Sequence, residues 1–190
     1  MEAQFEMASD RRQQRLQNGQ SEERPPRRAG VLILFYPGEQ GPIFPLIRRT
    51  EDGTVHSGQV ALPGGTYETS DGDLVQTALR ECHEEIGVAP DGMEVLGSLS
   101  DLYIPPSNFL VTPTVAVLSE PPAFQLDPLE VAAVIEARLE DLLDGSRIKT
   151  TEKYGFTVPY FDLEGEVVWG ATAMMLSELR RILAPEISRP

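Results

Sequence analysis

The feature that most constrains this chain is one segment that carries both an apolar helix face and a carboxylate face. Between residues 73 and 87, four apolar residues recur at helical spacing, namely Val75, Leu79, Cys82 and Ile86. Glu81, Glu84 and Glu85 stand at i, i+3 and i+4, so they share a different face. Asp71 or Asp73 suits the start of this helix and Gly87 its end. The segment predicts a helix packed on a core by one side.

Three carboxylates this close repel one another, at about a few tenths of a kcal/mol for each i,i+4 pair. Mg²⁺ or Mn²⁺ would offset the repulsion, because such hard cations prefer oxygen ligands. The alternative is a solvated acidic face on which Arg80 supplies a counter-charge. The preceding Pro63-Gly64-Gly65 favours a site, since a glycine backbone lets a phosphate or a metal approach main-chain atoms.

The rest of the chain divides into a polar arm and one domain. Residues 1–28 lack a sustained apolar face and predict an arm, with a short helix around residues 11–17. Residues 29–190 predict a single domain. Strands are expected at residues 31–36, 43–47, 59–62, 93–99, 110–118, 131–137 and 156–163. Helices are expected at residues 139–143 and 171–183, the second ended by Pro185, and residues 50–58 form a loop that suits a substrate lip.

Because strands outnumber helices and do not alternate strictly with them, the pattern predicts an α/β (α+β) fold with a mixed sheet flanked by helices. The longest apolar run, residues 31–36, is too short to cross a membrane, and no signal peptide is recognisable, so we expect a cytoplasmic protein without a membrane partner. The single cysteine, Cys82, lies at an apolar helix position and is expected to be a core thiol.

The formal net charge of −14 argues against a nucleic-acid partner, because such binding needs a field that attracts phosphates. An anionic small substrate is repelled as well, so divalent cations and local arginines would have to reverse the potential at its site. Arg48 and Arg49 are the candidates, since guanidinium groups suit phosphate oxygens; the alternative is a solvated strand end.

Residues 65–88 resemble the Nudix box, and the stretch Arg80-Glu81-Cys82-His83-Glu84-Glu85-Ile86-Gly87-Val88 matches it position for position. Gly65 and Asp71 keep the family's spacing, whereas the interval from Asp71 to Arg80 is one residue longer. The resemblance implies the Nudix fold, in which a mixed sheet lies between helices. It also implies hydrolysis of a nucleoside diphosphate linked to another group, with Mg²⁺ or Mn²⁺ as cofactor.

By position, the resemblance assigns metal binding to Glu81 and Glu85, with Glu84 as a further ligand or a group that orients water. It assigns Arg80 to a pairing with a box carboxylate that fixes the helix. Chemistry agrees, because metals must neutralise a diphosphate and help to generate a nucleophile from water. Glu130 is the choice for an additional general base, and Gly64 and Gly65 are expected to approach the substrate through their main chain.

The segment from Leu46 to Gly65 is similar to the extra signature of the coenzyme A pyrophosphatase branch, in which Arg49, Gly58 and Pro63-Gly64-Gly65 hold the spacing. It departs at Pro45, Ile47, Thr50, Leu62 and at Thr54, where that signature has a second arginine. Softer matches follow at residues 103–107, 130–131 and 169–173. The resemblance implies cleavage of coenzyme A or acyl-CoA to 3′,5′-ADP and a 4′-phosphopantetheine product, with a homodimer as a family-level expectation.

Two alternatives remain open. Thr54 leaves room for a Nudix hydrolase of another nucleoside diphosphate derivative, such as ADP-ribose or a dinucleotide. A non-catalytic nucleotide-binding module is the other, although all three box glutamates are retained. His56 and His83 are not assigned to the metal, since Mg²⁺ prefers oxygen. Trp169 is expected to pack in the fold, with stacking on an adenine as the alternative.

Overall fold

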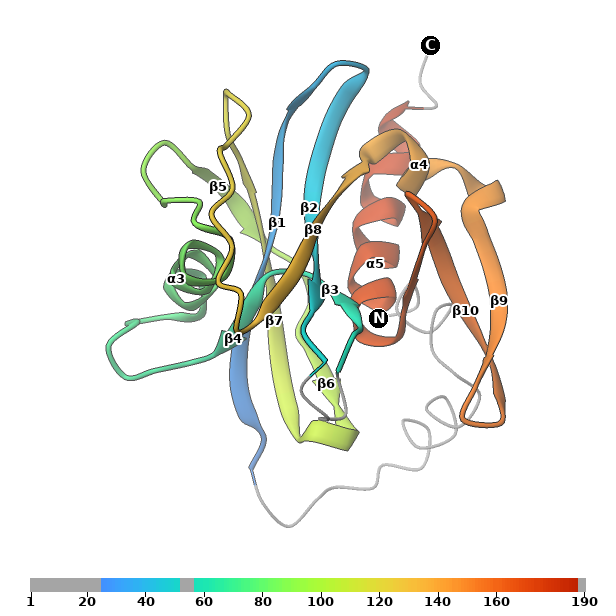
Figure 1. Cartoon of the computed structure of the whole chain (residues 1–190), viewed down its shortest axis with the longest axis horizontal. Helices are drawn as coiled ribbons and strands as arrows, with labels where there is room; N and C mark the ends of the chain where they lie inside the picture. The colour runs from blue at the N-terminus through green and yellow to red at the C-terminus, as the bar shows by residue number, and fades with distance from the viewer. Residues whose placement is uncertain (1–24, 52–56, 188–190) are drawn as a thin grey trace. The chain divides into compact units, whose positions relative to one another are not determined.

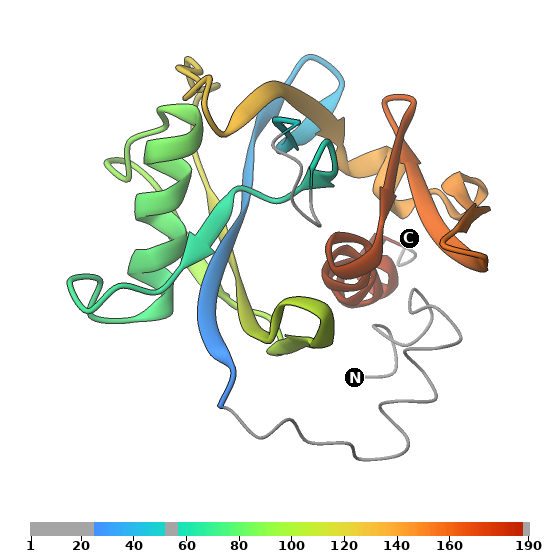
Figure 2. The same ribbon diagram turned by 60° about the horizontal axis from the view of Figure 1, so that its bottom comes forward.

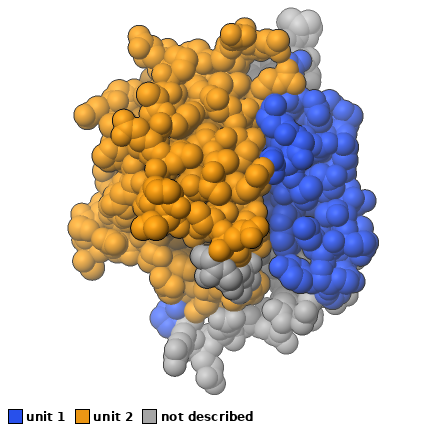
Figure 3. Space-filling view, viewed as in Figure 1, with its two compact units in different colours: residues 1–25, 140–190 blue, residues 26–139 orange. Residues whose placement is uncertain are grey.

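A computed structural model describes residues 25–51 and 57–187, and for residues 185–187 it describes the backbone only. Contacts within the chain divide it into two compact units, which are coloured separately in Figure 3. Pro26–Leu139 forms one unit, called here the sheet unit. The described part of the other, called here the hairpin unit, consists of Pro25 and residues 140–187.

The sheet unit is built on one mixed sheet of eight strands (Figure 1). Five strands lie in the order β3-β2-β1-β7-β5, while β4 pairs with β1, β6 with β7 and β8 with β2. The bounds are β1 Arg27–Gly38, β2 Gly41–Arg49, β3 Val60–Ala61, β4 Gly64–Thr66, β5 Glu94–Ser98, β6 Leu102–Ile104, β7 Phe109–Val117 and β8 Val131–Arg138. Only the β1–β7 pairing is parallel among the described strand pairs of this sheet.

Helix α3 (Leu74–Ile86) contacts β1 and β4 and lies beside the sheet in Figure 2. Its N-cap is Asp73, whose carboxylate accepts a hydrogen bond from the Gln76 N–H, so Asp73 rather than Asp71 caps the helix. Gly87 ends it in the left-handed conformation, at a φ of 74°, which glycine adopts without a steric penalty.

The apolar face of α3 enters the core as its spacing predicts. Leu79, Cys82 and Ile86 are buried, and Val75 is partly buried against the same cluster. The cluster joins them to β-strand residues that are also buried, namely Leu32, Leu34, Tyr36, Ile47, Ala116 and Val131. This packing fixes the rotation of α3, so the three glutamates lie on the other sides of the helix.

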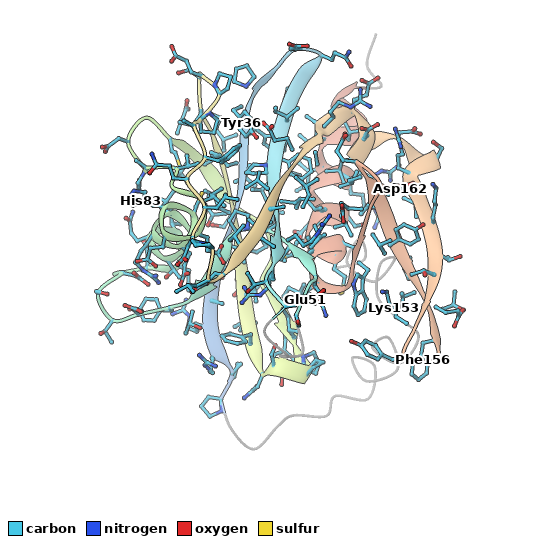
Figure 4. All side chains as sticks on the ribbon, in the orientation of Figure 1. Tyr36, Glu51, His83, Lys153, Phe156 and Asp162 are labelled. Atoms are coloured by element: carbon cyan, nitrogen blue, oxygen red, sulfur yellow. The ribbon has the colours of Figure 1, made fainter. Side chains whose placement is uncertain are left out.

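The hairpin unit contains a three-stranded antiparallel sheet, β9 (Ile148–Lys153), β10 (Phe156–Leu163) and β11 (Glu166–Trp169), and helix α5 (Gly170–Ile187), which contacts β10 and β11. Phe161, Leu163 and Val168 are fully buried. The Trp169 ring lies 6.0 Å from the Tyr154 ring and 5.7 Å from the Lys153 ammonium, so packing within the hairpin accounts for it. Figure 4 labels Lys153 and Phe156 near the hairpin tip.

One short helix and two single-turn 3₁₀ segments complete the described elements. Helix α4 (Leu139–Leu143) and strand β10 have the bounds that the sequence predicts. The 3₁₀ turns are η1 (Pro105–Ser107) and η2 (Gly145–Arg147). No helix among the described residues is long and apolar enough to cross a membrane.

The predicted mixed α+β fold is confirmed, and the expected strands and helices occur within a few residues of their predicted bounds. One helix end is wrong: α5 continues past Pro185 to Ile187. Pro185 removes one backbone hydrogen bond, and only two residues of the helix follow it, so the helix ends shortly after the proline rather than before it. Four strands were not expected from the sequence, β4, β6, β9 and β11. The helix expected around residues 11–17 lies outside the described residues, as does most of the arm 1–28.

Candidate active site

Arg80, on the exposed side of α3, is bonded to four partners. Its Nε and Nη2 donate to the two carboxylate oxygens of Asp71, at 2.7 and 3.1 Å. Its Nη1 donates to Glu84 Oε2 at 2.7 Å, and its Nη2 also reaches the Thr66 carbonyl at 3.1 Å. An ion pair with Glu81, at 3.0 Å, completes the set. The guanidinium therefore ties the loop before α3 to the carboxylates on the helix.

Asp71 holds this pairing although the loop is one residue longer than the family spacing. In addition to the hydrogen bonds from Arg80, the Asp71 carboxylate accepts hydrogen bonds from the Glu68 N–H and the Thr77 hydroxyl, both at 2.9 Å. The hydrogen bonds from Arg80 hold the pKa of Asp71 well below its usual range and raise the pKa of Arg80. The extra residue is thus absorbed within the loop, and the predicted role of Arg80 in fixing the helix has a geometric basis.

Glu85 is the most buried of the three box glutamates, with 2% of its side chain exposed. One oxygen, Oε2, accepts the Gly64 N–H at 2.8 Å. The other, Oε1, is buried and has no hydrogen-bond partner among the described residues. The pKa of Glu85 is raised to about 8, mainly by burial and also by the charges of Glu81 and Glu130, while the Gly64 N–H and the charge of Arg49 oppose the rise. A carboxylate in this state is poised to take a cation.

Glu81 lies beside Gly65, where a side chain would not fit. A Cβ atom at Gly65 would stand 2.5 Å from the carboxylate carbon of Glu81. Burial raises the pKa of Glu81, and Arg80 opposes that rise. The charges of Glu84 and Glu130 raise it further. The glycine therefore makes room for an acidic group that already repels its neighbours.

Glu130 belongs to the turn before β8 and comes near the box carboxylates from a distant part of the chain. The Thr50 N–H donates to the Glu130 carbonyl at 3.0 Å, and the Thr50 hydroxyl donates to the Leu129 carbonyl at 2.9 Å. The Asp127 N–H donates to the Glu85 carbonyl at 3.0 Å. These bonds join the end of β2 and the end of α3 to the turn that carries Glu130.

Arg49 closes the site from the end of β2. Its Nη1 lies 3.7 Å from Glu85 Oε1, and its backbone N–H donates to the Gln59 carbonyl at 3.0 Å. The β2–β8 register shifts between Arg48 and Arg49, which a β-bulge produces and which re-aims the side chains beside it. Arg48 pairs with Val60 and Ala133 in the sheet. Of the two predicted phosphate ligands, the structure places Arg49 against the carboxylate cluster.

Glu84 differs from the other two box glutamates. Its side chain is 58% exposed, and one oxygen is bonded to Arg80. Among residues 25–51 and 57–187, no three His, Cys, Asp or Glu side chains stand in a preformed metal-binding arrangement. The residues nevertheless fit a hard divalent cation, because Glu85 keeps an unused buried oxygen and Glu81 lies in the same cluster. The assignment of Glu81, Glu84 and Glu85 as ligands stays a prediction.

The two backbone positions expected to approach a substrate are occupied in other ways. The Gly64 N–H holds Glu85, and Gly65 pairs with Gly30 between β4 and β1. The Gly64 main chain therefore positions the Glu85 carboxylate and the Gly65 main chain belongs to the sheet, while direct contact with substrate stays a prediction. Cys82 is buried and free, and burial raises the pKa of its thiol to about 12, which agrees with the expected core thiol.

His83 is exposed on the side of α3 that faces away from the sheet, as Figure 4 shows, so it lies apart from the core face. His56 and Thr54 lie outside the described residues, together with most of the predicted lip. At its near end, Glu51 follows β2.

Thr50 and Asp127 belong to the site's framework but were not singled out as site residues in the sequence. Thr50 was noted only as a departure from a signature, and Asp127 carries no motif. The bond from Thr50 to Leu129 spans 79 residues, and the bond from Asp127 to Glu85 links the turn before β8 to the end of helix α3. Sequence spacing gives no signal for such contacts, whereas the turn residues Asp127-Pro128 do predict a turn before β8.

Comparison with known proteins identifies the family. The family model described as NUDIX domain matches residues 26–154. The chain is 35% identical over 161 residues to "Uncharacterized Nudix hydrolase NudL" of Enterobacter sp. (strain 638), covering 80% of this chain and 81% of that protein. It is 33% identical over 162 residues to "Nudix hydrolase 15, mitochondrial" of Arabidopsis thaliana. That match covers 80% of this chain but 56% of the plant protein, so the chain spans little more than half of that relative.

Solved structures agree with the fold. The Nudix hydrolase RenU from M. smegmatis superposes with a TM-score of 0.61 at 20% identity, over 84% of this chain and 86% of that one. The NUDIX domain of Shewanella oneidensis NrtR, complexed with ADP ribose, gives a TM-score of 0.52 at 24% identity, over 69% and 85%. At such identities the likeness establishes the fold, and the family model and relatives establish the rest: the chain is a Nudix hydrolase, a member of the Nudix family.

Proposed function

We propose that this Nudix hydrolase cleaves the diphosphate of coenzyme A or an acyl-CoA, with Mg²⁺ or Mn²⁺, to 3′,5′-ADP and a 4′-phosphopantetheine product. Water adds to one phosphorus, and the bridging P–O bond on that side breaks. The observation that carries the proposal is the contact between Arg49 and Glu85 at 3.7 Å. It joins Arg49, one of the residues that hold the spacing of the coenzyme A signature, to the buried carboxylate of the Nudix box.

We assign the box carboxylates different roles in binding the metal and orienting water, according to how buried each one is. Glu85 and Glu81 would hold the cation. Both are partly or fully buried and have raised pKa values, and a bound cation would stabilise their charged forms. Glu84 would serve as a further ligand or orient water from its exposed position. When bound, Mg²⁺ or Mn²⁺, which Nudix hydrolases generally use, supplies charge neutralisation at the diphosphate and activates water for attack.

Glu130 is the proposed general base. It is exposed, it is held by Thr50 through the backbone, and its charge acts on both Glu81 and Glu85. A carboxylate at the edge of the metal-binding cluster can take the proton that water loses. Arg48 and Arg49 would bind phosphate oxygens, and their positive charge would oppose the repulsion between an anionic substrate and an acidic protein.

The test is a substrate panel read by mass spectrometry. The purified protein is incubated with coenzyme A, ADP-ribose and NADH, with and without Mg²⁺. We expect metal-dependent 3′,5′-ADP from coenzyme A alone. Release of AMP from ADP-ribose or NADH, with coenzyme A intact, would retain the Nudix reaction and contradict the proposed substrate.

A second experiment separates catalysis from mere nucleotide binding. In Glu85→Gln, turnover should fall by about 10²–10⁴-fold, whereas binding of coenzyme A remains measurable. Glu94→Gln, at an exposed position of β5, is the matched control and should keep full turnover. If the unaltered protein bound coenzyme A with Mg²⁺ but never cleaved any of the three substrates, a binding module would replace the proposal. Light scattering on the same samples measures the expected dimer.

A further inference from the structure

Oxygen Oε1 of Glu85 is not used in a hydrogen bond with any described residue. Among the described residues, the Arg49 guanidinium is the cation recorded in an ion pair with it. Oε2 is taken by the Gly64 N–H at 2.8 Å, whereas Oε1 is buried and accepts no hydrogen bond from a described residue. Arg49 Nη1 lies 3.7 Å from Oε1, which is too long for a hydrogen bond but short enough for an ion pair. The pair is therefore electrostatic and loosely held.

Arg49 has an anchored backbone and a side chain with room to move. Its N–H is bonded to the Gln59 carbonyl, and the next residue, Thr50, is bonded to Glu130. The register shift on β8 sets the direction of the side chain, which is 29% exposed. The long arginine side chain can thus exchange its partner while the strand stays in place.

A divalent cation and Arg49 compete for the same oxygen. Both are attracted by Glu85 Oε1, and they repel each other when both lie beside it. A guanidinium that leaves this ion pair can donate two parallel hydrogen bonds to the oxygens of a diphosphate, whereas at 3.7 Å it donates none to Glu85 Oε1. After this exchange of partners, Glu85 is paired with the cation and Arg49 is paired with the diphosphate, so each has a favourable partner.

We propose that Arg49 pairs with Glu85 in the metal-free protein and is released to the substrate diphosphate when a divalent cation takes Glu85. Metal binding then makes Arg49 available to bind the anion. The metal and the anion therefore increase each other's affinity by more than their direct attraction would give. The inference rests on the proposed role of Glu85 as a metal ligand. Its main test uses neither metal nor turnover, so the two proposals can fail separately.

The test is a double-mutant cycle in EDTA, with inorganic pyrophosphate as the probe and calorimetry as the readout. It is run at about pH 9, so that the carboxylates are charged. Glu85→Gln should free Arg49 and tighten pyrophosphate binding by about fivefold or more. In the Arg49→Gln background the same change should alter binding by less than about twofold.

Simple removal of a negative charge gives a different pattern. If Glu85→Gln tightened pyrophosphate binding equally with and without Arg49, the proposed exchange of partners would be contradicted. It would also be contradicted if Glu85→Gln left pyrophosphate affinity unchanged. Arg28→Gln is the matched control, because it removes an equal charge at an exposed position of β1 that has no proposed role in binding phosphate. In that background the gain from Glu85→Gln should persist, and its loss there would also overturn the assignment to Arg49.

A measurement on the unsubstituted protein guards against misfolded variants. The Nε resonance of Arg49, identified by its loss in Arg49→Lys, reports the order of the guanidinium by ¹⁵N relaxation. The side chain should be ordered in EDTA and more mobile after Mg²⁺ is added without substrate. Equal mobility in both conditions would overturn the proposal.

Discussion

At the scale of single residues, two carboxylates of the site have opposite environments. Asp71 accepts hydrogen bonds from Arg80, Thr77 and the Glu68 N–H, which stabilise its charged form. Glu85 is buried with one oxygen unpaired, which destabilises its charged form. One group therefore contributes to folding as an anion, while the other opposes folding unless a proton or a cation neutralises it.

The raised pKa of Glu85 predicts how stability changes with pH in EDTA. Since the folded protein binds this proton more tightly than the unfolded chain, stability falls as pH rises from about 4.5 and levels off above the folded pKa of about 8. The loss should amount to a few kcal/mol. Urea unfolding of the unsubstituted protein and of Glu85→Gln across this range measures it. Identical slopes for the two proteins would contradict the prediction.

Asp71 predicts the reverse dependence. Its pKa is lowered by Arg80, so its contribution is present above about pH 4 and is lost as pH falls below that value. Asp71→Asn should therefore destabilise the protein by about 2 kcal/mol at neutral pH. The two proteins should converge in stability toward acid. Denaturant unfolding at several pH values tests this, and a difference that persists unchanged at low pH would refute it.

At the scale of elements, the site depends on how α3, β4 and the turn before β8 are held together. Strand β4 brings Gly64 and Gly65 to the helix, where one holds Glu85 and the other leaves space for Glu81. The end of β2 contributes Arg49 and, through Thr50, fixes Glu130. Strand β4, the end of β2 and the turn before β8 thus determine where the charged groups of the site lie. These groups are Glu81, Glu85, Arg49 and Glu130.

Gly65→Ala isolates the contribution of β4. The added Cβ would meet the Glu81 carboxylate at 2.5 Å, and this flexible group can move aside, so the fold should survive while the carboxylate is displaced. Turnover should fall by about 10²-fold, with a weaker apparent affinity for Mg²⁺ and a small change in Tm. At Gly145 an added Cβ meets its nearest described atom, on Arg180, only at 3.4 Å, so Gly145→Ala is the control. Full activity in Gly65→Ala would contradict the proposed position of Glu81.

At the scale of the whole molecule, a chain with a formal net charge of −14 must bind an anionic substrate. Long-range repulsion lowers the rate of encounter, and salt screens it over about 10 Å at 0.1 M. The kcat/KM for the proposed coenzyme A substrate should therefore rise between about 50 and 200 mM KCl at saturating Mg²⁺. Steady-state kinetics at fixed free Mg²⁺ measures this. A fall in kcat/KM would mean that attraction by the local arginines outweighs the repulsion.

The fold was predictable where the sequence has a regular pattern. Helix α3 follows from its apolar spacing and its caps, and β1, β2, β7 and β8 follow from short apolar runs between turn residues. Strands β4 and β6 have three residues each, and the exposed β9 has little apolar alternation, so only their pairing partners define them as strands.

What the sequence alone determined is the helix face of Glu81, Glu84 and Glu85, the glycine turn before it and the family to which they point, because each is a local pattern. Tertiary structure decided that Glu85 and not Glu84 is buried, that Gly64 holds it, and that Arg49 and Glu130 come near it. These contacts join residues 21 to 45 positions apart. Spacing along a chain cannot specify them, since they arise only when β2, β4 and β8 pair within one sheet and α3 packs beside them.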